Sequence, residues 1–426
     1  MNEEFLIYLW RYKLFKTDQL FVHETDEKIQ IIHPGSRNQD SGPDFFNAKI
    51  KIGNTIWAGN IEIHVKSSDW KLHKHQNDPS YDNIILHVVY TDNEPVYRMN
   101  GEKIPTIVLK GLFDPQILNT YQSFLNNANW IPCEQQLHQI DHFAQFTWFE
   151  SLCIERLESK ALGIAKQLQL TQQDFMEIFY RQLCRNFGFN TNADAFELLA
   201  RSLPFQIISK HIDRIDQLEA MIYGQAGMLV KNYKDNYPKA LQKEYAFLSE
   251  KYGLIALNPK IWKFLRMRPS NFPTTRLSQF ARLLQSTSGL LTKMLEFNRL
   301  SDLMTLFKVK ANKYWRDHSD FDRISKPKST QLGKSSTDLI LINTVIPFTF
   351  IYGKIFELDE IQDKSLLWYE QIPAEKNSLT RKFSSIGLKI ENAKQSQAAI
   401  HLKKHYCDNK RCLSCRFGHA LISRNM

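Results

Sequence analysis

The chain has 426 residues with ordinary apolar and charged fractions, which is long enough for two or three globular domains. No apolar run reaches about 18 residues, and the N-terminus lacks the basic start of a signal peptide, so we expect a cytoplasmic protein without a membrane partner. Most of the net charge of +10 arises in residues 376–426, where eleven Lys and Arg stand against two Asp and Glu. This predicts a polyanion partner, most often nucleic acid, unless the charge only solvates the surface.

The N-terminal stretch has the pattern of a small sheet preceded by a helix. Residues 2–14 are apolar at helical spacing, and residues 28–33 predict a first strand. Residues 45–52 and 55–66 alternate apolar and polar side chains on either side of Gly53-Asn54, which predicts a β-hairpin. After a connecting segment, the apolar run 84–90 predicts one more strand. The order is therefore helix, strand, strand pair, connection and strand.

The return strand of the hairpin carries charge on one face. Its apolar residues share one side, whereas Glu62, His64 and Lys66 share the other, because strand side chains alternate. Three ionisable groups in a row are costly to bury unless they pair or bind a ligand. The alternative is a solvated or mutually paired strand face of a binding domain.

Pro43-Asp44 followed one hairpin later by Glu62 resembles the active strand of the restriction-endonuclease-like PD-(D/E)XK nuclease superfamily. That family has Lys two residues after the acidic residue, where this chain has His64. At roughly 3.3 Å per residue, His64 lies about 7 Å from Glu62 along the strand and Lys66 about 13 Å, so His64 is the better occupant of the lysine position.

The resemblance implies a Mg²⁺ or Mn²⁺ site at Asp44 and Glu62, aided by the backbone carbonyl of Ile63. His64 or Lys66 would then orient or deprotonate the attacking water, which makes them the candidate catalytic residues. In this family the first helix often adds a carboxylate, a part that Glu4 would play here, although Glu3 and Glu4 are typical first-turn charges.

The connection at residues 67–83 is rich in histidine. His73 and His75, together with Asp78, would bind a transition metal or a phosphate, or form a polar loop without a ligand. A hydrolase that uses His64, His73 and His75 with Zn²⁺ is a weaker third possibility. His87 lies among apolar strand residues and is interpreted as a hydrogen-bonded core histidine.

The pattern of apolar residues changes after residue 110. Residues 96–99 and 104–109 flank an Asn100-Gly101 turn and predict a last hairpin. From residue 111 the spacing is helical, with Thr171 and Asp174 a capping-box-like helix start and Gly188 a stop. The loop predicted at residues 266–276 carries three arginines and two prolines, which suits phosphate contact or a helix–helix connection; the arginines are Arg266, Arg268 and Arg276.

A second resemblance extends over nearly the whole chain. The three predicted loops at residues 187–192, 223–227 and 266–276, the Pro43-Asp44 stretch and the cysteine tail together resemble a bacterial domain-of-unknown-function family of full-length proteins near this size. That resemblance implies one integral architecture and no activity. The polar segment 325–336 contains Gly333-Lys334-Ser335 but has Lys328 where a phosphate loop needs Gly, so no nucleotide P-loop is predicted.

The C-terminal residues predict a metal site. Three of the six cysteines, Cys407, Cys412 and Cys415, have C-x₄-C-x₂-C spacing, which suits a reducing compartment with Zn²⁺ or an iron–sulfur cluster better than disulfides. His419 or His405 is the nearer fourth ligand for zinc, whereas Cys133 would complete an iron–sulfur site; surface thiols are the alternative. Three basic residues near these cysteines are candidate nucleic-acid contacts: Lys403, Lys404 and Arg411. His73 and His75 are further candidates for such contacts.

These observations predict an α+β protein. We expect a nuclease-like α/β core with a mixed sheet at residues 1–110, a helical domain at 111–325, and a helical C-terminal region with a basic cysteine cluster at 326–426. The functional hypothesis is a metal-dependent nuclease of DNA or RNA. The alternative is a nucleic-acid-binding scaffold without catalysis on a degenerate nuclease fold, which the missing lysine would explain.

Overall fold

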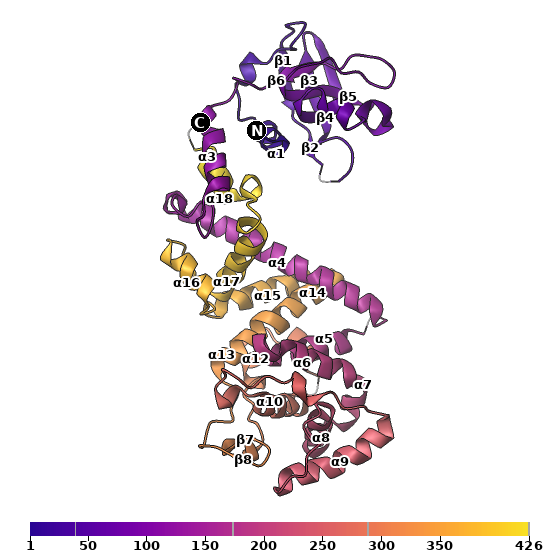
Figure 1. Cartoon of the computed structure of the whole chain (residues 1–426), viewed down its shortest axis with the longest axis vertical. Coiled ribbons are helices and arrows are strands. Elements are labelled where there is room, and N and C mark those ends of the chain that lie inside the picture. Colours follow the sequence, from indigo (N-terminus) through magenta and orange to yellow (C-terminus); the bar gives the residue numbers. More distant parts are fainter. Residues whose placement is uncertain (39, 173, 288, 425–426) are drawn as a thin grey trace. The chain divides into compact units, whose positions relative to one another are not determined.

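The computed structural model describes residues 1–38, 40–172, 174–287 and 289–424, and Figure 1 shows its helices and strands. The chain forms two compact units. The first comprises Met1–Trp148, Phe383–Leu388 and Ile400–Met426, and the second comprises Phe149–Lys382 and Lys389–Ala399. This division falls at other residues than the predicted boundaries at 110 and 325: the first unit runs to Trp148 and also includes C-terminal residues. The α+β class is confirmed, with a mixed sheet followed by a large helical part.

The first unit is built on a six-stranded sheet with the order β1-β3-β4-β5-β6, in which β2 pairs with β3. The strand pairs β1–β3, β2–β3 and β3–β4 are antiparallel, whereas β4–β5 and β5–β6 are parallel. The predicted helix–strand order is confirmed. The strands are β1 (Ile29–His33), β2 (Ser36–Arg37), β3 (Phe45–Ile52), β4 (Thr55–Lys66), β5 (Ile84–Thr91) and β6 (Thr106–Val108).

The β3–β4 hairpin forms where the alternating pattern places it. Gly53 has φ +55°, the left-handed conformation that a two-residue hairpin turn needs. Ala48, Ile50 and Ile52 are buried, as the alternation predicts. The register shifts between Phe45 and Ala48, where Asn47 has φ +56°, so a bulge lies three residues after Asp44.

The predicted last hairpin is only partly correct. Tyr97 and Lys103 form a single antiparallel bridge, but the following residues, β6, pair in parallel with β5 instead of extending that hairpin. A parallel pair needs a crossover connection, and residues 67–83 supply one between β4 and β5. That crossover contains α2 (Asp69–Leu72) and two 3₁₀ turns, His75–Asn77 and Pro79–Tyr81; His73 directly follows α2.

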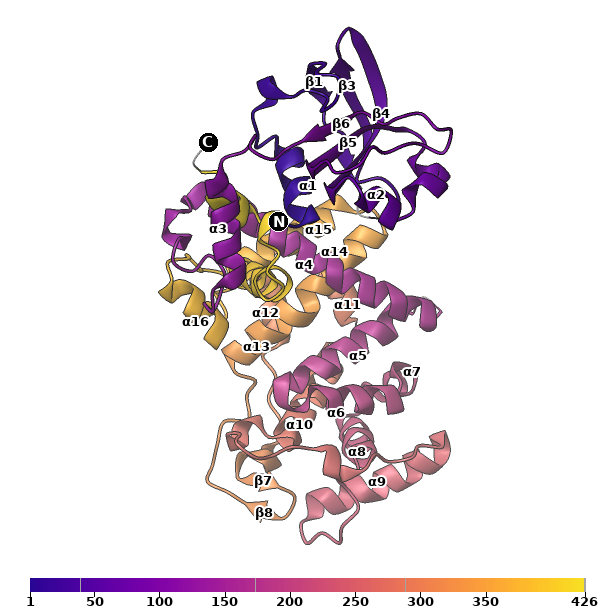
Figure 2. The same cartoon turned by 45° about the horizontal axis from the view of Figure 1, so that its top comes forward.

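Helices cover the sheet and extend the first unit. Figure 2 shows α1 (Glu3–Tyr12) beside the sheet, and residues 5–10 of this helix are all buried. Helix α3 (Pro115–Asn126) begins with Asp114, whose side chain accepts a hydrogen bond from the Gln116 N–H at 2.8 Å. In this unit α3 contacts α18 (Arg416–Ile422), so residues almost 300 positions apart share a core.

The second unit is helical, apart from the short pair β7 (His318–Asp320) and β8 (Arg323–Ile324). Asp174 itself caps α5 by accepting a hydrogen bond from the Glu177 N–H at 2.9 Å, so the helix starts three residues later than the predicted Thr171 cap; Gly188 ends the helix, as predicted. Helices α4, α16 and α17 cross the division between units. The helices are α4 (His142–Leu170), α5 (Phe175–Phe187), α6 (Phe189–Ser202), α7 (Phe205–Ile208), α8 (Ile215–Gln225), α9 (Asn236–Tyr252), α10 (Pro273–Ser286), α11 (Leu290–Glu296), α12 (Leu300–Leu306), α13 (Lys334–Ile340), α14 (Ile346–Ile355), α15 (Asp359–Gln371), α16 (Ser378–Ser385) and α17 (Ala393–His401).

The string at residues 223–227 is the buried end of α8 rather than an open loop. Gly224 lies against the ring of Tyr245, and Gly227 has φ +72° with the Leu257 carbonyl oxygen directly beside its Cα. The Trp262 Nε1–H donates to the Ala226 carbonyl at 2.8 Å. Close packing therefore explains why glycine occupies positions 224 and 227. The string at 187–192 is likewise a helix–helix junction and not a loop, since α6 begins at Phe189.

Among the described residues, one continuous helical stretch, Lys334–Ile355, is long and apolar enough by length and composition to cross a membrane. It consists of α13, a π-helical turn at residues 341–345, and α14. Of its most apolar window, 67% is buried inside the protein, which is the burial that a core helix shows.

Candidate metal centre

The two carboxylates singled out in the sequence lie together on neighbouring strands. The Asp44 backbone N–H donates to Glu62 Oε2 at 3.0 Å, and the Ile63 N–H donates to Asp44 Oδ2 at 3.1 Å. The other Asp44 oxygen accepts a hydrogen bond from Arg37 Nη1 at 2.7 Å. Three of the four carboxylate oxygens are thus engaged by the protein, and Glu62 Oε1 is the oxygen that faces the histidines.

Burial raises the pKa of these acids, and neighbouring carboxylates add to the shift of Glu62 and Glu3. Burial, and then the neighbouring Asp44, raise the pKa of Glu62 to about 9. Burial also raises the pKa of Asp44, although Arg37 opposes the shift. The same causes raise the pKa of Glu3 to about 7, because Asp44 and Glu62 lie near the start of α1. A bound cation would favour the charged forms of these three acids, which makes them candidates for a metal site.

Glu3, rather than the predicted Glu4, is the carboxylate that the first helix brings to this site. Glu4 is exposed, whereas Glu3 is half-buried and interacts electrostatically with Asp44, Glu62 and Asp69. The signal in the sequence was present, since both residues lie in the first turn of α1, but helical spacing alone does not say which one faces the sheet.

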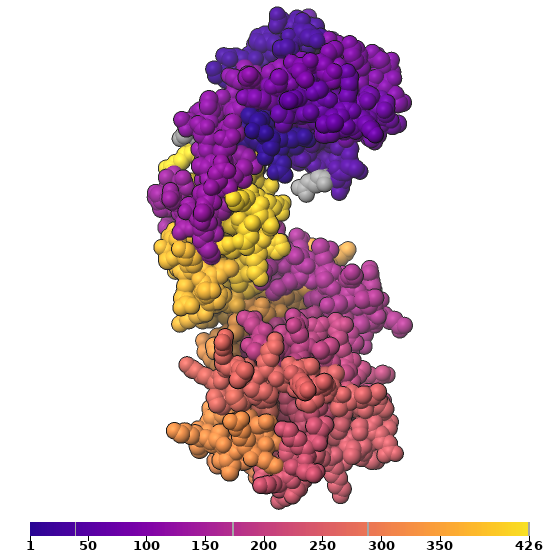
Figure 3. Space-filling model, in the orientation of Figure 1, coloured from indigo at the N-terminus to yellow at the C-terminus, as the bar shows by residue number. Residues whose placement is uncertain are grey.

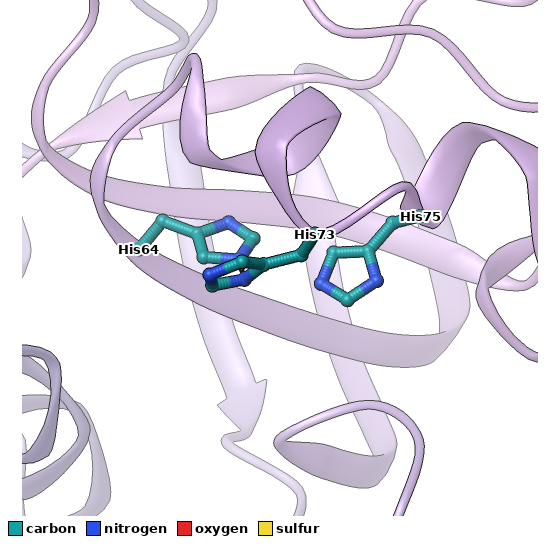
Figure 4. A group of neighbouring side chains, drawn as sticks. All are labelled: His64, His73 and His75. Carbon is teal, nitrogen blue, oxygen red and sulfur yellow. Dashed lines mark hydrogen bonds between the residues drawn. The ribbon is translucent and has the colours of Figure 1, made fainter.

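Three histidines complete the site, and Figure 4 shows them turned toward one another. One ring nitrogen from each of His64, His73 and His75 lies within 4.8 Å of the other two. His64 Nε2 is 3.1 Å from His73 Nδ1. Glu62 Oε1 is 3.3 Å from His75 Nε2 and 3.7 Å from His64 Nε2. The crossover connection therefore carries two histidines back to the charged face of β4.

Packing around the histidines fixes their orientation. The His75 ring stacks on Tyr81 with centroids 3.8 Å apart, and Trp70 presents its edge to His64 at 6.5 Å. His64 Nδ1 is 2.8 Å from His87 Nε2, deep in the sheet. Because β4 and β5 pair in parallel with Glu62 opposite His87, both side chains lie on the same face. His87 is buried, as interpreted from the sequence, but it also contacts the site.

Burial keeps these imidazoles neutral at physiological pH. It lowers the pKa of His64 to about 2 and that of His87 to about 3, and neighbouring histidines lower both further. Burial also lowers the pKa of His75. A neutral imidazole has a lone pair on one ring nitrogen, which is the form that binds a metal.

The donor set fits a divalent transition ion. His75 Nε2 is buried and has no hydrogen-bond partner among the described residues, although it points at Glu62 Oε1. Imidazole nitrogens with one carboxylate oxygen suit zinc, manganese or iron better than magnesium, which prefers oxygen ligands. His64 would use Nε2 for the ion while its Nδ1–H donates to His87, the usual way in which a neighbouring acceptor orients a ligand histidine.

Lys66 does not join this group. It lies at the end of β4 with an exposed side chain, and its backbone N–H donates to Asp69 Oδ2 at 2.9 Å. His64, the other predicted catalytic residue, is fully buried among aromatic rings. His73 is the exposed histidine of the cluster, so the centre is accessible to solvent on that side.

The three predicted phosphate-binding arginines have different surroundings. Arg266 and Arg268 are exposed. Arg276 lies within α10 rather than in the predicted loop, and it is 5% exposed. Its guanidinium donates to Asn271 Oδ1 at 2.7 Å and to Ser336 Oγ at 2.9 Å, and it covers the Phe189 ring. Arg276 therefore holds three segments of the second unit together.

We expect Arg276→Ala to lower the free energy of unfolding by about 3 kcal/mol, because it leaves buried hydrogen-bonding groups without partners. Arg268→Ala, at an exposed position nearby, should change it by less than about 0.5 kcal/mol. Urea titration measures both. The interpretation fails if Arg276→Ala unfolds at the wild-type urea concentration but weakens the binding of a fluorescent oligonucleotide.

The basic C-terminal residues are partly neutralised inside the first unit. Lys403 pairs with Asp408 and lies 5.2 Å from the Trp130 ring centroid. Arg411 lies 5.3 Å from the Tyr406 ring centroid, and Lys404 is exposed. His419 Nδ1 is 3.0 Å from the Tyr8 hydroxyl, and its ring packs on Tyr12 at 4.1 Å. Nδ1 and the ring of the predicted zinc ligand His419 thus contact aromatic residues of α1.

Neither curated proteins nor solved structures gave a match to this chain. A family model does match, over residues 3–378, which includes the Pro43-Asp44 stretch and all three loop strings and leaves the cysteine tail outside the matched range. The resemblance to a family of unknown function is confirmed. Because the match spans most of the chain, this protein belongs to the family described as protein of unknown function (DUF2851).

Proposed function

We propose that the first unit is a metal-dependent hydrolase of phosphodiester bonds in nucleic acid. The observation that carries the proposal is the convergence of Glu62 Oε1 with the ring nitrogens of His75 and His64, at 3.3 and 3.7 Å. Glu62 and His64 lie beside Asp44 on β4, the return strand of the hairpin that follows Pro43-Asp44, which supports the resemblance to the PD-(D/E)XK superfamily. The sheet order, with an antiparallel hairpin followed by a crossover to a parallel strand, agrees with that proposal.

In this proposal Glu62, His64 and His75 hold the ion. The exposed His73 either serves as a further ligand or leaves that coordination position open. A divalent ion, when bound, supplies Lewis-acid activation of water and of the phosphoryl oxygen. Arg37 fixes Asp44, which in turn positions Glu62 through its backbone N–H. Glu3 is the half-exposed acid whose pKa is raised to about 7, which suits proton exchange with water near neutral pH.

The preference for a polyanion rests on charge. The chain has 55 Lys and Arg against 45 Asp and Glu. Exposed cations on both units, among them Lys404, Arg266 and Arg268, offer contacts to a phosphate backbone that do not depend on base sequence. We therefore propose nucleic acid as the substrate class, with Mn²⁺ favoured over Mg²⁺ because of the imidazole ligands.

The test is cleavage of end-labelled DNA and RNA, single- and double-stranded, by the full chain with Mn²⁺, Mg²⁺ or Zn²⁺. We expect cleavage that depends on the added ion, is faster with Mn²⁺ than with Mg²⁺, and falls more than about 10-fold in His75→Gln. His138→Gln, which changes an exposed histidine of the same unit, should leave the rate unchanged. Absence of cleavage under every condition would overturn the proposal.

One observation favours the second candidate, a nucleic-acid-binding scaffold without catalysis. Both oxygens of Asp44 are already hydrogen-bonded, one of them to a cation, so this carboxylate has little left to offer a magnesium ion. If the wild-type chain binds oligonucleotides with a strong dependence on salt and cleaves none of them, the scaffold is the better description.

A further inference from the structure

The cysteines of the first unit lie in the loop at residues 130–134 and in the C-terminal segment. The six cysteines of the chain are thiols rather than disulfides. Cys412 and Cys415 are each 7% exposed, and Cys133 is buried to the same extent. Cys407 is half-buried. Of the six, these four belong to the first unit, whereas Cys153 and Cys184 belong to the second.

Several contacts bring the loop that contains Cys133 to the C-terminal segment. Trp130 packs on Phe383 with ring centroids 4.7 Å apart and receives Lys403 over its face. Lys403 is one helical turn before Cys407. The Lys410 ammonium donates to the Leu125 carbonyl at the end of α3. Figure 3 shows the yellow C-terminal residues beside the purple residues that include α3, in agreement with the contact between α3 and α18.

The C-x₂-C segment is folded into a tight turn. The Cys415 N–H donates to the Cys412 carbonyl at 3.3 Å, and the His419 N–H donates to the Cys415 carbonyl at 2.8 Å. A Cβ on Gly418 would lie 2.0 Å from the Cys412 carbonyl oxygen, so only glycine lets α18 pass this close. Two thiols three residues apart are thereby held in one short turn.

Electrostatic coupling supports the grouping of the four thiols. Burial raises the pKa of the Cys133 thiol, and Cys415 and Cys412 raise it further. The pKa of Cys407 is raised by burial and then by Cys415, Cys133 and Cys412. Like-charge interactions of this kind act only over short distances. The His419 ring contacts Tyr8 and Tyr12.

We propose that Cys133, Cys407, Cys412 and Cys415 form a four-thiolate metal centre that fastens the C-terminal segment to the loop at residues 130–134. Cys133, nearly 280 positions upstream, takes the fourth position in place of His419. Tetrahedral Zn²⁺ and iron–sulfur clusters both accept four thiolates. Each thiol must lose its proton to bind, and the nearby Lys403 and Lys410 offset part of the resulting negative charge.

The test uses the full chain and thiol alkylation read by mass spectrometry, which does not detect histidine ligands. After removal of bound metal, addition of Zn²⁺ should protect the four cysteines together, each by more than about 10-fold in rate. Cys153 and Cys184 serve as internal controls whose rates should not respond to the ion. Metal analysis of the protein as purified distinguishes zinc from iron with labile sulfide, and either ion on these four thiolates supports the proposal.

Variants then identify the fourth ligand. With Co²⁺ in place of the native ion, Cys133→Ser should lose about a quarter or more of the thiolate-to-cobalt charge-transfer intensity, while His419→Ala and Cys153→Ser keep it. Far-UV circular dichroism checks that each variant is folded. The proposal is overturned if Zn²⁺ protects none of the four wild-type thiols, or if it protects the C-terminal three and leaves Cys133 reactive.

Discussion

Glu62→Gln is expected to lower metal-dependent cleavage more than about 100-fold while it stabilises the protein in the absence of divalent ions. The change removes the carboxylate oxygen that faces His75 and His64, so the ion loses its charged ligand. It also removes a buried acid whose neighbours oppose its ionisation. Glutamine keeps an acceptor for the Asp44 N–H, which now bonds to Glu62 Oε2.

The stability effect should depend on pH in a defined direction. The pKa of Glu62 is raised from its ordinary value of 4.5 to about 9, so the folded state binds the proton more tightly than the unfolded state does. The free energy of unfolding of the wild type therefore falls as pH rises from about 4.5 toward 9. Near pH 8 without divalent ions, Glu62→Gln should melt about 3 °C higher, a gain of about 1 kcal/mol.

Two controls make this result specific. Glu27→Gln, at an exposed position of the same unit, should change neither cleavage nor melting. At pH 4, where Glu62 is protonated in both states, the wild type and Glu62→Gln should melt together. Equal melting temperatures at pH 8 would contradict the crowding of the carboxylates, and unchanged cleavage would remove Glu62 from the centre.

Gly227→Ala is expected to cost more than about 3 kcal/mol in the free energy of unfolding. Its φ of +72° disfavours any residue with a Cβ, and that atom would lie 2.0 Å from the Leu257 carbonyl oxygen. The oxygen cannot move away easily, because the Leu257 N–H is bonded to the Gln225 carbonyl at 2.8 Å. The clash is between the new Cβ and a backbone oxygen, so no change of side-chain rotamer can relieve it.

Gly253→Ala is the matched control for the conformational part of this cost. Gly253 has φ +63° at the end of α9, and a Cβ there would meet no atom within 4 Å. It should therefore cost only about 1 kcal/mol. Urea unfolding followed by far-UV circular dichroism measures both. Equal losses in the two variants would show that the close approach of residue 257 is relaxed in solution.

Local patterns predicted the sheet well. The alternation in residues 45–52 and 55–66 and the Gly53-Asn54 turn place β3 and β4 correctly, because two-residue periodicity and turn chemistry are local properties. That Asp44 and Glu62 share a face also follows from the hairpin. The parallel pairing of β6 with β5 was not predicted, since a short run after a turn signal carries no information about which strand it will join.

Residues that act across long sequence distances were harder to place. Nothing local distinguishes Glu3 from Glu4, or shows that Arg276 bonds to Ser336 and is buried. The contact between His64 and His87 depends on the register of a parallel pair, which is set by the whole crossover. The sequence therefore identified the face of the site, while the partners of its residues required the tertiary fold.

The return of residues 400–424 to the first unit has a consequence for how the protein is made. A ribosome releases the sheet and its histidine-bearing crossover early, but the segment that packs on α3 and α1 emerges only after the entire second unit. During translation the apolar surfaces of α1 and α3 therefore stay exposed to solvent until the C-terminal segment is made. The second unit has time to fold before that segment emerges. Chains truncated near residue 380 should therefore expose these helices and be prone to aggregation and proteolysis, even though every strand of the sheet is present.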